Sequence, residues 1–287
     1  LEKRGIRVWM TCLNDFGTVD PERDVGLIDE PATAEAWKAA VAAMPEHKKG
    51  VSPRNNDVGA IDPRMRAIHI RRMQQLADWP NKHKGGIRLA DDPQMAIWEL
   101  SNEEWTYARL VNGGWQKLPR FFVAQLERKW TEFLVGKYGD DAGLARAWGF
   151  LLPGESLAGD RVLLAPLARP SDGKAYNDGN AAAIAVLTGA KQTFSRDDFT
   201  RRRGEDVMEF FHRLHVAYKT DRRDIAKSLG KSLRLSPLVL DTGDGFRIQS
   251  VALHQHGDAS TMCAYIWQTA ADRQQPGFPF MSGLNEP

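Results

Sequence analysis

Three polar residues suited to acid–base chemistry follow a short apolar run. The segment "MAIWELSNEEW" covers residues 95–105 and places Asn102, Glu103 and Glu104 near its end. The apolar start of this segment predicts a buried strand. A carboxyl group at the end of a buried strand is held in one place, where it can donate or accept a proton. The pattern therefore predicts that strand burial fixes a carboxyl group at a functional surface.

The elements that would position this group alternate along the chain. Apolar, β-rich runs predict strands at residues 5–13, 95–100, 235–242 and 260–267. Helical stripes lie between them, at residues 62–78, 118–137, 137–149 and 204–229. Strands that alternate with helices are typical of parallel βα units with right-handed crossovers. In such units the functional side chains gather at the carboxyl ends of the strands.

The start of the first of these helices has a clear signature. Asp62 stands at the cap position and Pro63 at the first helical position, and an amphipathic pattern follows. Two other regions are rich in Asp, Gly, Pro or Asn. We expect loop insertions near residues 14–60, around a helical patch at 31–44, and near residues 150–200.

Composition excludes several classes of protein. The chain has 287 residues, 39 basic and 37 acidic side chains, and a formal net charge of +2. It therefore lacks the excess of basic residues that is typical of nucleic-acid-binding proteins. No stretch is apolar enough for a membrane span. Cys12 and Cys263 do not make a disulfide framework or a zinc site by themselves. Nine tryptophans suit sugar binding, although aromatic residues more often serve the core.

The segment around residue 103 resembles a known group of enzymes. "LADDPQMAIWELSNEE" is similar to the fourth-strand segment of clan-A glycoside hydrolases, the cellulase-like (β/α)8 barrels, in which a strand ends in Asn-Glu. "DPRMRAIHIRRMQQLADWPNKHKGG" resembles the helix and loop before that strand. "KYGDDAGLARAWG", followed by "GESL", resembles the region after it. The resemblance covers most of residues 1–157.

The resemblance implies a fold and a domain organisation. We expect an α/β protein with a (β/α)8 TIM barrel as a single catalytic domain over residues 1–287. About strands two to six of the barrel are visible in this chain. The first strand and the last two are expected to lie outside residues 1–287.

It also implies a role for the strand end. A glycosidase needs one protonated carboxyl group for the leaving oxygen and one ionised carboxylate for the anomeric carbon or a water. Glu103 is the expected acid/base, and the apolar surroundings of Trp98 and Trp105 favour its protonated form. Asn102 would hydrogen-bond the sugar 2-hydroxyl. In the other interpretation, Glu103 is a helix-start carboxylate favoured by the helix dipole.

Two neighbouring acids compete for the role. Glu99 alternates with Trp98, so we expect it to point into the barrel with a hydrogen bond to a neighbouring strand. Glu104 is expected to face away from Glu103, in solvent or paired with Arg109.

The second carboxylate has no clear position in the chain. In the resembling families the nucleophile is a Glu at the end of the seventh strand, and the sixth is expected at residues 260–267. Glu286 is the one Glu that follows. We expect the nucleophile beyond residue 287, with Glu286 as the alternative.

The sixth strand in those families carries a His and an aromatic residue near the sugar. Tyr265 and Trp267 match this pattern as substrate-binding residues, whereas Ala264 stands where His is common. Trp105, after the fourth strand, is a further candidate sugar platform. His256 or His254, slightly earlier in the chain, would substitute for it, although surface histidines are the commoner explanation.

The function expected from the resemblance is hydrolysis of a β-linked glycoside or polysaccharide with retention of configuration. The alternative is a non-catalytic carbohydrate-binding or scaffold protein on a degenerate barrel, which the missing nucleophile and Ala264 favour. A carbohydrate is the expected partner, and a protein acting on polysaccharide would be secreted or periplasmic. No cofactor or metal is implied, because His212 and His215 lack an HExxH pattern and resemble surface or packing histidines.

Overall fold

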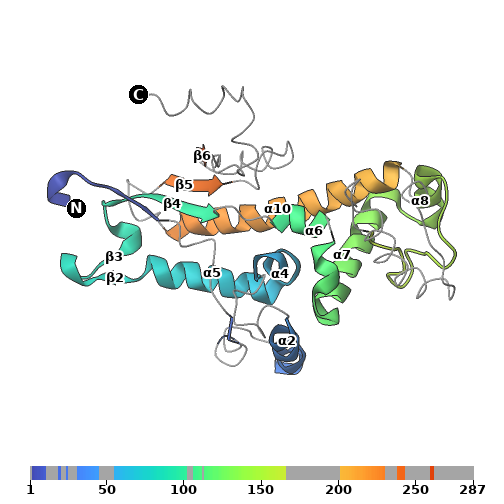
Figure 1. Cartoon of the computed structure of the whole chain (residues 1–287), viewed down its shortest axis with the longest axis horizontal. Coiled ribbons are helices and arrows are strands. Elements are labelled where there is room, and N and C mark those ends of the chain that lie inside the picture. Colours follow the sequence, from blue (N-terminus) through green and yellow to red (C-terminus); the bar gives the residue numbers. More distant parts are fainter. Residues whose placement is uncertain are drawn as a thin grey trace, which may run out of the picture.

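The computed structural model describes residues 2–10, 19–20, 24, 31–44, 55–101, 106–111, 113–165, 201–229, 238–242 and 259–261 (Figure 1). Its strands are β1 Val8–Met10, β2 Pro80–Asn81, β3 Ile87–Arg88, β4 Met95–Ser101, β5 Leu238–Thr242 and β6 Ala259–Thr261. Its α-helices are α2 Pro31–Ala43, α4 Asn55–Ile61, α5 Pro63–Ala77, α6 Thr106–Val111, α7 Arg120–Tyr138, α8 Asp141–Trp148 and α10 Arg201–Leu229. None of the helices in these ranges combines the length and the apolar character that crossing a membrane requires.

The principal sheet is parallel and has the order β1-β4-β5-β6. The predicted strand at 95–100 is confirmed by β4. The predicted strands at 5–13 and 235–242 are confirmed in their described parts: β1 begins at Val8, β5 covers Leu238–Thr242, and residues 11–13 and 235–237 lie outside the described residues. Of the predicted strand at 260–267 the structure describes β6, and residues 262–267 lie outside the described residues. Strands that follow one another in both sequence and space occur in (β/α)8 barrels. The described residues form a sheet of four strands, and a complete barrel stays a prediction.

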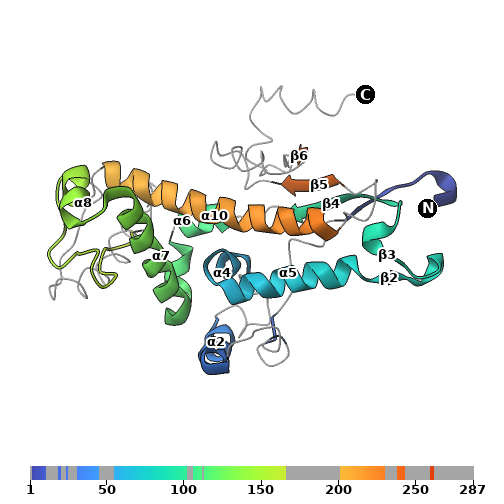
Figure 2. The same cartoon turned by 180° about the vertical axis from the view of Figure 1, so that it is seen from behind.

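Two helices cover the sheet. The C-terminal parts of α5 and α10 lie below β4 in Figures 1 and 2. Met73 and Ala77 of α5 form one buried cluster with Met95 and Trp98 of β4, and Leu229 of α10 packs against it. Burial of each large apolar side chain contributes roughly 1.5–3 kcal/mol, so this cluster fixes the strand against its helices.

The start of α5 confirms the predicted cap. The carboxylate of Asp62 accepts a hydrogen bond from the backbone N–H of Met65 at 2.8 Å, and Pro63 occupies the first turn. The same buried carboxylate accepts hydrogen bonds from Trp37 Nε1 at 3.2 Å and from Gln125 Nε2 at 2.7 Å. Asp62 therefore caps α5 and also ties it to α2 and α7.

Helix α10 runs most of the length of the molecule (Figure 2). Its N-terminal half packs against α7 and α8, and its C-terminal half lies under the sheet. The core between α7, α8 and α10 is aromatic. The ring of Trp130 stacks on the rings of Phe133 and Trp148, with 5.6 and 6.2 Å between ring centroids. It also meets the ring of Phe210 edge-on, with 5.2 Å between centroids. The predicted helices at 118–137, 137–149 and 204–229 are confirmed with small shifts in their ends.

Gly59 of α4 allows the rings of His69 and Tyr218 to pack closely against the backbone of this helix. A Cβ atom added to Gly59 would lie 2.7 Å from the imidazole of His69 and 3.1 Å from the ring of Tyr218. Alanine normally stabilises a helix by about 1 kcal/mol relative to glycine. We expect Gly59→Ala to lower the free energy of unfolding instead, by about 1–3 kcal/mol, because the buried rings must shift. Urea denaturation measures this change.

Gly136 of α7 is the matched control, because a Cβ atom there meets no atom within 4 Å. Gly136→Ala is expected to raise the free energy of unfolding by about 0.5–1 kcal/mol. Equal stabilisation by both substitutions would contradict the close packing around Gly59.

Candidate active site

Strand β4 ends at the place where the sequence predicts the catalytic carboxyl group. The strand pairs in parallel with β1 on one side and β5 on the other, and Ser101 at its end is in register with Asp241. The arrowhead of β4 points toward α6, which begins at Thr106 (Figure 1). Residues 102–105 join these two elements in the sequence and lie outside the described residues.

Glu99 has the hydrogen bond expected of it. Its side chain is buried, and its Oε2 accepts a hydrogen bond from Nε1 of Trp9 on the neighbouring strand β1 at 3.0 Å. Trp98 packs in the cluster under the sheet with α5 and α10. Glu99 therefore joins two strands across the sheet.

The other predicted site residues lie outside the described residues. They are Asn102, Glu103, Glu104, Trp105, His254, His256, Ala264, Tyr265, Trp267 and Glu286. Glu103 follows Ser101 by two residues, and Tyr265 follows Thr261 by four.

The first turn of α6 is tied to α4 by a forked ion pair. Arg109 donates from Nε to both carboxylate oxygens of Asp57, at 3.0 and 2.9 Å, and from Nη2 to Oδ1 at 2.7 Å. The same Nη2 donates to Oγ1 of Thr106 at 3.3 Å. Asp57 and Thr106 are buried. The sequence suggested Glu104 as a partner for Arg109, and the described residues supply Asp57 as one carboxylate partner.

Helix α10 packs histidines against α6. The ring of Tyr107 lies 6.2 Å from that of His212 and 6.3 Å from that of His215. His215 is fully buried, so of the surface and packing roles expected for it the structure supports packing. Burial holds the pKa of His215 well below its ordinary value, and the nearby charges of Lys219 and Arg222 lower that pKa further. This imidazole is therefore neutral at neutral pH.

A second neutral histidine lies at the α4–α5–α10 contact. Nδ1 of buried His69 is 2.9 Å from the hydroxyl of Tyr218. Burial lowers the pKa of His69 most, and the charge of Arg222 lowers it further. Among the residues that the structure describes, no three His, Cys, Asp or Glu side chains come together as a metal site.

Sequence reasoning missed the buried charges of this region. Asp57, Lys219 and Arg222 are all buried. For the two residues of α10 the sequence contains a signal of burial. Lys219 and Arg222 follow His215 by four and seven residues, so they lie on the same face of the helix as His215. Asp57 stands in a region expected to be loop, and no sequence pattern indicated its partner.

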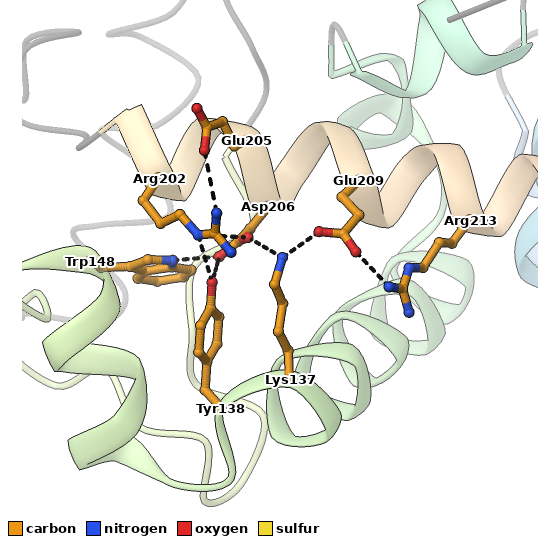
Figure 3. Close-up of polar contacts among 8 residues, drawn as sticks. All are labelled: Lys137, Tyr138, Trp148, Arg202, Glu205, Asp206, Glu209 and Arg213. Atoms are coloured by element: carbon orange, nitrogen blue, oxygen red, sulfur yellow. Dashed lines mark hydrogen bonds and ion pairs between the residues drawn. The ribbon is translucent and has the colours of Figure 1, made fainter. Parts of the chain in front are cut away.

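A separate polar network joins α7, α8 and α10 around Asp206 (Figure 3). The fully buried carboxylate of Asp206 accepts hydrogen bonds from Tyr138 Oη at 2.5 Å, Trp148 Nε1 at 2.7 Å and Lys137 Nζ at 2.7 Å. Lys137 also pairs with Glu209. Each donor comes from α7 or α8, so Asp206 holds both helices to α10 and its oxygens are occupied by structural contacts.

This network predicts a loss of stability at both ends of the pH range. Burial and the hydrogen bond to Asp206 raise the pKa of Tyr138 above 10.0. The hydrogen bond from Lys137 lowers the pKa of Glu209 below 4.5. A group whose pKa is raised by folding stabilises the folded state at pH values below its unfolded-state pKa, and this contribution is lost as the pH rises through its folded-state pKa. A group whose pKa is lowered by folding stabilises the folded state above its unfolded-state pKa, and this contribution is lost as the pH falls through its folded-state pKa. We expect the melting temperature to fall above about pH 10 and below about pH 4.5.

Melting curves from pH 3 to pH 11.5 measure this dependence. The variant Tyr138→Phe keeps the ring and removes the titrating hydroxyl, so its alkaline decline is expected to be shallower than that of the wild type. Identical alkaline slopes would contradict the contribution of Tyr138.

Comparisons with known proteins leave the chain without a matching relative. No family model matches it, and no curated protein or solved structure is significantly similar to it.

Proposed function

We propose that this chain is part of a glycoside hydrolase that cleaves a β-linked glycoside or polysaccharide with retention of configuration, on a (β/α)8 barrel. The observation that carries the proposal is the position of β4. It is an internal strand of a parallel sheet, it is anchored by Trp98 and Glu99, and it ends two residues before Glu103. The carboxyl edge of such a sheet is where α/β enzymes place their catalytic groups.

The proposed roles follow from the chemistry of the glycosidic bond. Glu103 donates a proton to the leaving oxygen and then, as a carboxylate, activates the water that hydrolyses the glycosyl-enzyme. Asn102 binds the sugar 2-hydroxyl, and Trp105, Tyr265 and Trp267 are the sugar platforms, with His256 beside them. The nucleophile is a carboxylate beyond residue 287, with Glu286 as the alternative.

A turnover assay tests the proposal. The full-length protein that contains this chain is incubated with a panel of aryl β-glycosides and β-linked polysaccharides, and released aglycone and reducing ends are measured. Hydrolysis of at least one substrate, with the first product retaining the β configuration by NMR, is the expected result. Binding to the same sugars without any turnover would support the non-catalytic alternative and would overturn the proposed activity.

A further inference from the structure

We infer that His69 and His215 form a pH-sensitive switch at the contact of α10 with α4, α5 and α6, which is closed at neutral pH and opens in mild acid. The inference concerns conformation and does not depend on the proposed function. Both imidazoles are fully buried. Imidazole is the side-chain group that ordinarily changes its charge between pH 5 and 8. Each of these rings must therefore stay neutral for the contact to stay closed.

His69 of α5 lies where three helices meet. Its Nδ1 is 2.9 Å from the hydroxyl of Tyr218 on α10. Its ring also lies against α4, because a Cβ atom on Gly59 would come within 2.7 Å of it. The guanidinium groups of Arg66 and Arg222 lie 5.8 and 5.1 Å from the centroid of the Tyr218 ring. A proton on His69 would therefore add a third cation to this junction.

His215 lies on α10 and faces α6. The centroid of its ring is 6.3 Å from that of Tyr107. Among the described residues, the titratable and charged groups around it are Lys219, Arg222 and His212 of α10 and Tyr107 and Arg109 of α6. Lys219 and Arg222 are buried as well. Protonation of His215 would thus place another positive charge among buried cations.

The nearby carboxylates are already bound to arginines. They form three ion pairs: Asp57 with Arg109 at 2.7 Å, Asp221 with Arg66 at 2.6 Å, and Asp24 with Arg72 at 2.7 Å. A buried charge is tolerated when an opposite charge balances it. Since these carboxylates already balance arginines, a new imidazolium would compete with the arginines for them.

Proton uptake is therefore coupled to opening of the contact. Burial lowers the pKa of both histidines most, followed by the charge of Arg222 for His69 and of Lys219 for His215. Once opening exposes the rings to water, each takes up a proton near pH 6.5. A pKa that is lower in the closed state stabilises that state above about pH 6.5, and this stabilisation is lost as the pH falls. Each histidine makes opening about 10-fold more favourable at pH 5.5 than at pH 7.5, and the two together about 100-fold.

The N-terminal half of α10 is held by contacts of another kind. Helices α7 and α8 contain no histidine. They pack on α10 through the aromatic core around Trp130 and through the hydrogen bonds to Asp206. Between pH 7.5 and 5.5 the contact with α4, α5 and α6 is therefore expected to open before the contact with α7 and α8.

Urea denaturation of the full-length protein at pH 7.5 and 5.5 is the first test. The unfolding equilibrium constant of the wild type is expected to rise about 100-fold between the two values, and about 10-fold in His69→Asn or His215→Leu. His83→Gln is the control, because His83 is exposed on the short helix Lys82–Lys84, and it is expected to keep the wild-type dependence. His69→Gln or His215→Gln replaces a variant that fails to fold by circular dichroism. Wild-type dependence in a folded variant at either histidine would overturn the switch.

Hydrogen exchange at the same two pH values tests where the protein opens. The measured rates are divided by those of unstructured peptides at the same pH, because the chemical rate itself depends on pH. Peptides within α4 and within residues 213–223 are expected to lose protection at least about 10-fold at pH 5.5, and peptides within residues 126–134 much less. The double variant His69→Asn with His215→Leu is expected to lose this difference. Equal loss of protection in both regions of the wild type would overturn the assignment of the opening to this contact.

Discussion

Replacing Glu103 with glutamine is expected to lower kcat for a β-glycoside with an unactivated leaving group by about 10²–10⁴-fold, the usual contribution of a general acid or base. The amide keeps the size of the carboxylate but neither donates the proton to the leaving oxygen nor accepts one from water. In the proposed function other groups bind the substrate, so KM is expected to change much less than kcat. Initial rates over a range of substrate concentrations separate the two constants.

The leaving group sharpens this expectation. An aryl group that departs as a stable phenolate needs no proton, so formation of the glycosyl-enzyme should slow far less with it in the Glu103→Gln variant. Hydrolysis of that intermediate still needs a base, and a burst of released phenol followed by a slow phase is expected. Azide needs no base, so it should restore turnover and yield a β-glycosyl azide.

The adjacent residue provides the control for this experiment. Glu104→Gln makes the same chemical change one position further on and is expected to retain kcat within a few-fold. Undiminished hydrolysis by Glu103→Gln, or equal losses in the two variants, would contradict the assignment of Glu103 as acid/base.

Removing the carboxylate of Asp206 is expected to cost about 3–5 kcal/mol of folding free energy, the range for breaking a buried charged contact. Three donors lose their acceptor together, namely the hydroxyl of Tyr138, the indole N–H of Trp148 and the ammonium of Lys137 (Figure 3). The amount is a large part of the stability of a typical domain. Urea denaturation of Asp206→Ala, followed by tryptophan fluorescence, measures it.

Glu205 is the control on the same helix. It pairs with Arg202 at 3.5 Å, and its side chain is 39% exposed, so the contact is a surface ion pair. Such pairs contribute about 0–1 kcal/mol, and Glu205→Ala is expected to stay within that range. A loss below about 1 kcal/mol for Asp206→Ala would mean that water replaces the carboxylate at the α7–α10 contact.

Local patterns predicted several elements of this fold correctly, whereas α4 and α6 form where no helix was predicted. The Asp62 and Pro63 signature predicted the start of α5, and the bond from Met65 N–H to Asp62 confirms it. The apolar run at residue 95 predicted β4, and the alternation along it predicted that Glu99 bonds a neighbouring strand. These features depend on residues within a few positions of one another, so the sequence contains all the information they need.

The candidate site was predicted as a location in the chain. Strand β4 and its carboxyl end follow from the segment at 95–105, whereas the roles of Asn102, Glu103 and the aromatic platforms stay predictions, because those residues lie outside the described ones.

The sequence by itself determined where helices α5, α7, α8 and α10 and strand β4 form, and which carboxyl group follows β4 in the chain. The tertiary structure alone decided which charges meet. Asp57 and Arg109 are 52 positions apart, and Lys137 and Asp206 are 69 apart. The reason is physical: helix and strand periodicity is a local property of the backbone, whereas a buried ion pair exists only after distant elements pack and exclude water from both of its members.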